Sequence, residues 1–343
     1  MASFSRKRIV LTAVAVFFLM AVFLFLGLGL FFIRPADEGG KERVFVVKEG
    51  LSLKEVAAEL ERDHLIRSKA LFMFWTRLMG YSRQIKAGEY ALAPHMSPME
   101  ILEKLRRGII ITHPVTVPEG FTATQIADLL AEKGLVEKEA FLSLTKDSNI
   151  LGKHGISGPS LEGYLYPDTY QFGRGISASA IIDVMVGHFW QVVGPYREKA
   201  EAIGMKMKEV VVLASIVEKE TGRPEERPTI ASVFLNRLKR GMRLESDPTV
   251  IYGLKNFNGN LRKRDLGKRT PYNTYMIRGL PPGPIANPGL ESIKAVIYPA
   301  KTKYLYFVSK NDGSHHFSKT LSEHNRAVEI YQKRKRRRPQ KTS

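Results

Sequence analysis

The chain has 343 residues, which is enough for two or three domains with substantial hydrophobic cores. It contains no cysteine, and this excludes disulfides, zinc–cysteine motifs and thiol catalysis. The formal net charge is +19, with 53 Lys and Arg against 34 Asp and Glu, so acidic partners such as anionic lipids or acidic polymers are expected.

The first predicted element is a membrane-spanning helix at residues 9–33. This stretch has no charged residue and would be about 37 Å long as a helix, against a hydrocarbon core of about 30 Å. Arg6, Lys7 and Arg8 precede it, so the positive-inside rule predicts a cytoplasmic N-terminus and an extracytoplasmic chain after residue 34. The apolar run is too long for an ordinary cleaved signal, and we expect an uncleaved signal anchor. A cleaved signal peptide is the alternative.

A polar linker at residues 34–43 leads into a predicted small α/β domain at residues 44–108. Its opening, VFVVKEGLSLKEVAAEL, predicts a short strand, a turn at Gly50 and a helix that begins with a capping box of Ser52 and Glu55. It continues with KAGEYAL, a predicted strand. The segment SPMEILEKLRRG then has the start and stop signals of a helix.

The order strand, Gly turn, capped helix occurs a second time, in VTVPEGFTATQIADLL at residues 115–130. Here Gly120 is the turn, and Thr122 with Gln125 forms the predicted capping box. We interpret the two segments as a two-copy repeat. The first domain resembles LysM, a small module that binds glycans containing N-acetylglucosamine. A packing module without a ligand is the alternative.

An aromatic loop, SLEGYLYPDTYQF, follows at residues 160–172. Its candidate substrate-binding residues are Glu162, Tyr166 and Asp168, because flat rings stack on sugar faces and phenol groups add hydrogen bonds. The alternative is that the rings pack against the core.

The stretch ASIVEKETG places two glutamates at the end of a predicted amphipathic helix. On a helical wheel Glu218 lies within the apolar arc of Val211 and Ala214, whereas Glu220 points to the other side. Burial and the carbonyl end of the helix dipole would both disfavour the ionised form of Glu218. A protonated carboxyl is what glycosidic bond cleavage requires. The alternative is a partly exposed glutamate paired with a lysine or arginine.

The remaining segments predict a helix at residues 229–242, a rigid loop of prolines and glycines up to residue 289, and a strand at residues 304–310. A turn, a short strand and a final helix follow. Glu220 is a further candidate for substrate binding, together with polar and aromatic side chains in these later segments: Asn236, Asp247, Tyr252, Tyr272, Asn273 and Tyr275.

Taken in order, ASIVEKE, FLNRL, SDPTVIYG, YNTY, GLPPGPIANPG, YLYFV and the final HxFxxTxxEHN pattern closely resemble the endolytic murein transglycosylases, the YceG-like family. The resemblance runs from about residue 44 to the last helix. It implies an α+β fold with an N-terminal transmembrane helix, a LysM-like subdomain and a larger catalytic domain at residues 109–332. It also implies an enzyme of the inner membrane that acts on peptidoglycan in the periplasm.

The resemblance further implies one catalytic glutamate, Glu218, and no cofactor. Glu218 would protonate the glycosidic oxygen between N-acetylmuramic acid and N-acetylglucosamine. It would then take the proton of the sugar's own 6-hydroxyl, which closes a 1,6-anhydro ring without water. Asp247, Asn236, Tyr272 and Asn273 would position the substrate. If the enzyme were a hydrolase, Asp247 would be the second carboxylate.

The sequence also leaves three alternative functions. The family has carried the label aminodeoxychorismate lyase, but a soluble pyridoxal-phosphate enzyme conflicts with the predicted anchor. A non-catalytic peptidoglycan-binding scaffold is a second alternative. The basic tail at residues 333–343 prompts a nucleic-acid hypothesis, yet outside the membrane lipid headgroups and acidic wall polymers are the expected partners. His315, His316 and His324 lack metal-ligand spacing, so no metal is predicted. An enzyme that cuts nascent strands is expected to lie near the cell-wall synthases, although no residue in the sequence indicates such a contact.

Overall fold

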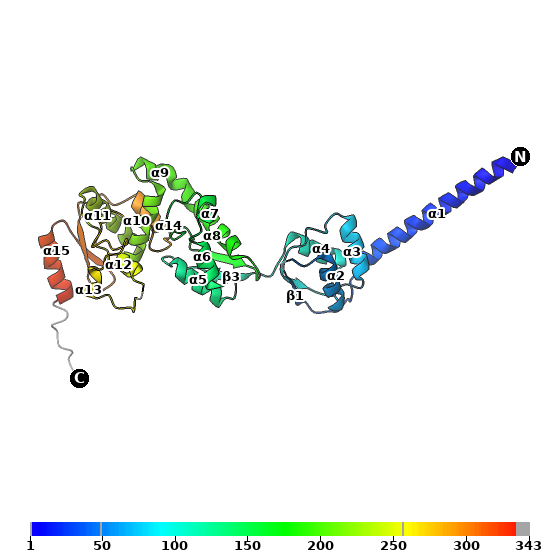
Figure 1. Ribbon diagram of the computed structural model, residues 1–343, viewed down its shortest axis with the longest axis horizontal. Helices are drawn as coiled ribbons and strands as arrows, with labels where there is room; N and C mark the ends of the chain where they lie inside the picture. Colours follow the sequence, from blue (N-terminus) through cyan, green and yellow to red (C-terminus); the bar gives the residue numbers. More distant parts are fainter. Residues whose placement is uncertain (1, 49, 256, 334–343) are drawn as a thin grey trace, which may run out of the picture. The chain divides into compact units, whose positions relative to one another are not determined.

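The computed structural model describes residues 2–48, 50–255 and 257–333, and the chain divides into two compact units. The first unit comprises Met1–His113 and Gln171–Ile176, and the second comprises Pro114–Tyr170 and Ser177–Ser343. Both units mix helices with two-stranded sheets, as Figure 1 shows, so the α+β class predicted from the sequence is confirmed. The basic tail predicted at residues 333–343 lies outside the described residues except for Lys333.

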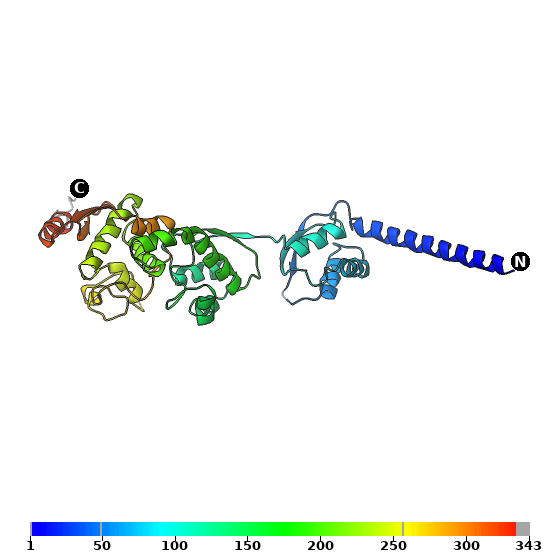
Figure 2. The same cartoon turned by 90° about the horizontal axis from the view of Figure 1, so that it is seen from above.

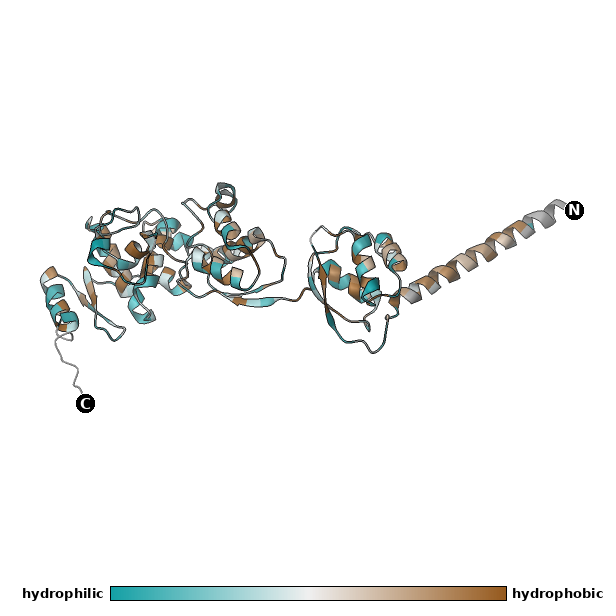
Figure 3. Cartoon of the chain, turned by 60° about the horizontal axis from the view of Figure 1, so that its bottom comes forward, coloured by the Kyte–Doolittle hydropathy of each residue, from teal (hydrophilic) through white to brown (hydrophobic). Residues whose placement is uncertain are grey.

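Helix α1, Ala2–Ile33, contains a window at Val10–Leu30 that is long and apolar enough to cross a membrane. The mean hydropathy of this window is 2.7, and none of it is buried within the protein. Figure 3 shows apolar residues all round this helix. A helix without a polar face does not suit a water-exposed surface, so its length and composition are compatible with a single-pass membrane anchor.

In the first unit, β1, Arg43–Val47, pairs antiparallel with β2, Gly88–Leu92. Three helices pack on this sheet, and they are α2, Leu53–Arg62, α3, Lys69–Leu78, and α4, Pro98–Arg107. The predicted strands and helices are confirmed, including the capping box of Ser52 with Glu55. Gly108 ends α4 in the left-handed conformation, with φ of 73°, which glycine adopts without steric cost.

The core of the first unit is built from side chains on the inner faces of these elements. Phe45 and Tyr90 face each other across the sheet, and Leu60, Phe72 and Leu105 come from the three helices. Phe32, at the end of α1, also belongs to this core. The last turn of the apolar helix is therefore packed into the folded unit.

The second unit opens with the second copy of the predicted repeat. Thr122 and Gln125 form its capping box, and Gly120 adopts a positive φ of 75° as Gly50 does with 85°. The two short strands β3, His113–Thr116, and β4, Thr169–Phe172, pair with each other. The helices that follow β3 are α5 Ala123–Glu132, α6 Lys138–Leu144, α7 Ser148–Lys153, α8 Ala178–Val193, α9 Arg197–Ala202, α10 Met207–Glu220, α11 Arg227–Lys239, α12 Asp247–Gly253, α13 Lys263–Leu266, α14 Leu290–Ile297 and α15 Leu321–Val328.

Helix α10 lies at the centre of the second unit, packed against α11 and α14 (Figure 1 and Figure 2). Every residue of α10 from Val210 to Val217 is buried. A helix that is apolar on all sides along such a stretch has to be covered all round, and this fixes its place in the interior. The loop at residues 279–289 has no regular structure, as predicted, and the hairpin of β5, Tyr306–Ser309, and β6, His315–Ser318, follows α14.

The aromatic loop at residues 160–172 does not offer its rings to a ligand. Tyr164, Tyr166, Tyr170 and Phe172 are all buried, so the packing alternative is the one observed. Such rings contribute large apolar areas to the core, which explains their number in one short loop.

The contribution of the first core is testable through Phe72, which is 1% exposed. We expect Phe72→Ala to lower the free energy of unfolding of the first unit by about 3–5 kcal/mol, because it leaves a cavity in the core. Urea unfolding of the full chain in detergent measures this. Met99→Ala on α4, a partly exposed position, is the control and should change stability by less than about 1 kcal/mol.

Candidate active site

Glu218 lies in the last turn of α10 and is held by two groups from other elements. Arg227 Nη2 donates to Glu218 Oε1 at 2.8 Å, and the backbone N–H of Gly289 donates to Glu218 Oε2 at 3.0 Å. The Glu218 and Arg227 side chains are only 6% and 9% exposed. Glu218 is buried as the sequence predicts, and it is also paired with an arginine, which was the alternative.

These contacts explain why an acidic residue stands at the carbonyl end of a helix. Gly289 is the N-cap of α14, so Glu218 faces the positive end of that helix dipole as well as the guanidinium of Arg227. Arg227 is the first residue of α11, and the side chain of Glu218 therefore connects three helices. Its contacts are those of a buried structural ion pair, whose loss would leave an uncompensated charge.

A second carboxylate shares Arg227. Glu119 Oε2 lies 3.4 Å from Arg227 Nη2, in the turn before Gly120. Burial raises the pKa of Glu119, and the nearby charge of Glu218 adds to this, while Arg227 acts in the opposite direction. One guanidinium thus balances two acidic side chains.

Glu220, the last residue of α10, faces a cavity. Ser246 Oγ donates a hydrogen bond to Glu220 Oε1, and Ser246 itself is buried. Burial raises the pKa of Glu220 to about 7, and the charge of Asp247 also raises it, whereas the Ser246 hydrogen bond and Arg237 lower it. Glu218 and Glu220 contact different elements, as the helical wheel predicts, and the segment at Ser246 lies against the side that Glu220 faces.

The cavity has a volume of about 480 Å³, which is within the range of small-ligand sites. Its wall combines the end of α10 with α11, the segment before α12, the β5–β6 hairpin and α15. Polar and charged side chains dominate this wall: Glu220, Arg237, Glu245, Asp247, Tyr275, Ser309, His315 and His324. A polar cavity of this size, with a carboxyl that titrates near neutrality, is a candidate for acid–base chemistry.

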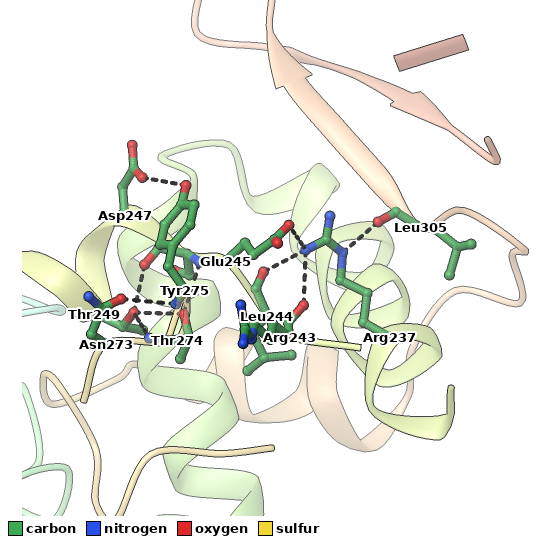
Figure 4. Close-up of polar contacts among 11 residues, drawn as sticks. Arg237, Arg243, Leu244, Glu245, Asp247, Thr249, Asn273, Thr274, Tyr275 and Leu305 are labelled. Atoms are coloured by element: carbon green, nitrogen blue, oxygen red, sulfur yellow. Dashed lines mark hydrogen bonds and ion pairs between the residues drawn. The ribbon is translucent and has the colours of Figure 1, made fainter. Parts of the chain in front are cut away.

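Asp247 and Tyr275 form one side of this cavity, as Figure 4 shows. Tyr275 Oη donates to Asp247 Oδ1 at 2.7 Å. Behind them Thr249 and Thr274 bond to each other through their hydroxyls at 2.8 Å, and the backbone N–H of Ser246 donates to Thr274 Oγ1 at 3.0 Å. This buried network fixes the segment that carries both the Glu220 partner and Asp247.

Arg237 holds the opposite side of the same segment. Its Nη1 lies 3.0 Å from Glu245 Oε2 and also donates to the carbonyl oxygen of Leu244 at 2.9 Å, while its Nε donates to the carbonyl of Leu305 at 2.7 Å (Figure 4). The planar guanidinium suits this role because it donates several hydrogen bonds in fixed directions. Arg237 therefore connects α11, the segment before α12 and the chain that enters β5.

Several predicted site residues lie together, but away from this cavity. Glu162 is buried and accepts hydrogen bonds from the backbone N–H of Ala123, from Asn287 Nδ2 at 2.9 Å and from Tyr252 Oη at 3.2 Å. The ring of Tyr272 contacts that of Tyr252 edge to face. Burial raises the pKa of Glu162 to about 7. Tyr252 also lines a second pocket of about 620 Å³, with Thr122, Gln125 and Ile251.

Other predicted site residues hold backbone in place. Asn236 Nδ2 donates to the carbonyl oxygens of Thr302 and Tyr304, both at 3.0 Å. Asn273 is fully buried, and its amide bonds three backbone groups of the loop around it. The side chains of both asparagines are therefore occupied by structural hydrogen bonds.

Tyr166 and Asp168 lie in a different environment again. Tyr166 is buried beside the ring of His188, and His188 Nε2 lies 2.7 Å from Asp168 Oδ2. The structure therefore separates many of the predicted site residues, and it brings Glu220, Asp247 and Tyr275 together at one cavity.

The sequence did not reveal that Arg227 pairs with Glu218, that Ser246 donates to Glu220, or that Glu226 contacts His315. His315 Nδ1 lies 2.6 Å from Glu226 Oε2, and this pair places His315 in the cavity wall. Each of these contacts joins residues that are far apart in the chain or in different elements. A charged residue at a helix start, such as Arg227, was the only local signal. Within the described residues there is no cluster of His, Asp or Glu that would hold a metal ion.

A model of the YceG-like family matches residues 45–330, which is most of the chain. The chain belongs to the YceG-like family. The resemblance inferred from the ordered motifs is thereby confirmed, and the matched range includes Glu218, Glu220 and the wall of the cavity up to α15.

Two curated relatives in this family carry the same name. An endolytic murein transglycosylase of Bacillus subtilis is 34% identical over 316 residues, which cover 87% of this chain and 88% of that protein. An endolytic murein transglycosylase of Streptococcus pneumoniae is 30% identical over 329 residues, covering 86% of this chain and 59% of that protein. The crystal structure of a YceG-like protein from Listeria monocytogenes is 35% identical and matches with a TM-score of 0.59, over 84% of this chain and 100% of that chain.

The ion pair of Glu218 predicts a specific pattern of stability. We expect Arg227→Ala to lower the free energy of unfolding by about 3–5 kcal/mol, because Glu218 would be left buried without its counter-charge. The double variant Arg227→Ala with Glu218→Gln should recover part of this loss. Urea unfolding of the two single variants and the double variant gives the coupling, and strictly additive effects would contradict the ion pair.

The environment of Glu220 predicts a pH-dependent stability. In the folded protein the Glu220 carboxyl keeps its proton up to about pH 7, whereas in the unfolded chain it releases the proton near pH 4.5. The free energy of unfolding therefore falls as pH rises between those values. Glu220→Gln should therefore be more stable than the wild type at pH 8 and equal to it at pH 4. Urea unfolding over this range measures the difference. Glu225→Gln, at an exposed position, is the control and should show no such difference.

Proposed function

We propose that this protein is an endolytic peptidoglycan lytic transglycosylase. It cleaves the bond between N-acetylmuramic acid and N-acetylglucosamine within glycan strands and leaves 1,6-anhydro ends, which would limit the length of nascent strands. The observation that carries the proposal is the cavity with Glu220, whose carboxyl keeps its proton near neutrality beside Asp247 and Tyr275. Membership in a family whose curated relatives are named for this activity supports it.

The chemistry requires one group that gives and then takes a proton. A protonated carboxyl delivers its proton to the glycosidic oxygen as the bond breaks. The resulting carboxylate accepts the proton of the sugar's 6-hydroxyl, whose oxygen attacks the anomeric carbon and closes the ring. No water is consumed. A group with pKa near the working pH serves both steps well, because neither form is strongly preferred.

Between the two carboxyls at the end of α10, the contacts favour Glu220 for this role over Glu218, which the sequence predicts. Both oxygens of Glu218 accept hydrogen bonds, from Arg227 and from the backbone N–H of Gly289, and Glu218 does not line the cavity. Glu220 has one hydrogen bond, from Ser246, and lines the cavity. In this proposal Glu218 positions the end of α10, and Glu220 carries out the proton transfers.

Asp247 and Tyr275 are the proposed substrate-positioning groups. Asp247 lines the cavity with Glu220, and its charge contributes to holding the proton on Glu220. Tyr275 orients Asp247 through their hydrogen bond. A specific observation also favours a second candidate function. Glu220 and Asp247 line the same cavity, and a glycan hydrolase uses a pair of carboxyls, of which Asp247 would activate a water.

The proposal includes a location and a domain division. Helix α1 anchors the protein in the inner membrane with its N-terminus in the cytoplasm, and the remainder lies in the periplasm, near the cell-wall synthases. Residues 44–108 form a LysM-like subdomain that binds glycan, and residues 109–332 form the catalytic domain. The antiparallel pair of β1 and β2 with two helices between them supports the LysM-like subdomain.

Digestion of purified peptidoglycan by the full chain, followed by mass spectrometry of the new ends, tests this function. We expect 1,6-anhydro ends from the wild type and a loss of about 10²–10⁴-fold in their rate for Glu220→Gln, with a melting temperature no lower than that of the wild type. The matched control Glu225→Gln should retain activity, because that side chain is exposed. New reducing ends would identify a hydrolase instead.

The same assay separates the two glutamates. Glu218→Gln should lose stability, and the fraction that remains folded should still form anhydro ends. If folded Glu218→Gln is inactive while Glu220→Gln retains activity, Glu218 is the acid as predicted from the sequence, and our assignment of Glu220 is wrong. Glycan binding without any cleavage product from the wild type would support the scaffold alternative.

A further inference from the structure

Helix α3 in the first unit has an apolar strip that the protein itself does not cover. Phe74 is 45% exposed and Leu78 56% exposed, and both lie on the rim of a groove of about 590 Å³. Ala70, Met73 and Arg77 lie at the helical spacing that places them on the same face. Large apolar side chains at this exposure, one turn apart, indicate a contact surface.

The adjacent face of α3, which carries Trp75, packs directly on the predicted membrane-spanning helix. The ring of Trp75 lies 5.0 Å from that of Phe25 and 5.8 Å from that of Phe32, measured between centroids. Between these two, Gly29 has no side chain, and a Cβ there would lie 3.6 Å from the Trp75 ring. The Trp75 ring therefore lies within van der Waals reach of the α1 backbone at Gly29.

These contacts determine how deep α3 lies if α1 spans the bilayer. Phe25 and Gly29 both belong to the apolar window that ends at Leu30. With a rise of about 1.5 Å per residue, Phe25 lies about 7–8 Å inside the outer end of that window. Amphipathic helices at membrane surfaces bury their apolar face to about 5–10 Å, so α3 lies at the matching depth.

We infer that α3 is an interfacial helix that inserts Phe74 and Leu78 into the outer leaflet of the membrane and thereby holds the first unit on the bilayer surface. The inference rests on the transmembrane anchor included in the proposed function, but not on the enzymatic activity. The occupant of the strip is lipid because α1 and α3 are in contact within the apolar window, where lipid surrounds α1.

The charges beside the strip suit an anionic lipid surface. Lys69 and Arg77 both line the groove, and the long side chains of such residues reach headgroups while their stems lie along apolar surface. Lys69 Nζ lies 3.8 Å from the carboxylate of Glu61, at an exposed site where ion pairs are weak. Anionic headgroups attract basic side chains that lie near the membrane surface.

The absence of cysteine allows a direct test with single-cysteine variants of the full chain. Nitroxide labels are placed at Phe74→Cys and Leu78→Cys, and the protein is reconstituted in vesicles of phosphatidylethanolamine and phosphatidylglycerol. Power saturation then compares collisions with oxygen, which partitions into lipid, and with a water-soluble nickel chelate. We expect both labels to collide more with oxygen than with nickel.

Two further labels serve as controls. Val46→Cys on β1 is 46% exposed, almost the same as Phe74, and should collide mainly with nickel. Val14→Cys lies within the apolar window of α1 and should collide mainly with oxygen. If the Val14 label is accessible to nickel, the membrane anchor itself fails.

A result specific to α3 would overturn the inference. If the Val14 label lies in lipid while the labels at 74 and 78 collide mainly with nickel, α3 does not insert. Spin–spin broadening between labels at position 78 would show instead that a second copy of the chain covers the strip. Neither result depends on whether the protein cleaves peptidoglycan, so this test and the digestion assay can fail independently.

Discussion

The ion pair between Glu218 and Arg227 organises the second unit. A guanidinium and a carboxylate that are this deeply buried must neutralise each other, because each alone would carry a large desolvation cost. With the backbone N–H of Gly289 as a third member, the pair fixes the ends of α10, α11 and α14 relative to one another. The loop at residues 279–289 ends at this point. The last residue of α10 is consequently held against the segment that carries Ser246 and Asp247.

Two glutamates separated by a single lysine lie in different surroundings. Glu218 contacts the guanidinium of Arg227 and the N-terminus of α14. Glu220 meets a neutral hydroxyl, a nearby carboxylate and little water, so its pKa rises to about 7. Arg237 moderates this effect and at the same time holds the cavity wall through backbone carbonyls. The contacts that hold Glu218 thus also position the end of α10, where Glu220 faces the cavity.

The first unit shows a different use of packing. Trp75 lies between the folded core and α1, with its ring against Phe25 and Phe32. Helix α1 is thus packed against α3 and α4 of the first unit.

The sequence by itself determined the local elements. The capping residues Ser52, Ser97 and Thr122, the turn glycines and the apolar run of α1 act over a few neighbouring residues, and the helices and strands form where these signals predict. The ordered motifs also determined the family. Only the tertiary structure decided which carboxyl faces the cavity, because a helical wheel cannot show that the segment at Ser246 returns to cover Glu220. For the same reason Asn236, Asn273 and Tyr166 were predicted as site residues, and the fold uses them to bond its own backbone and to fill its core.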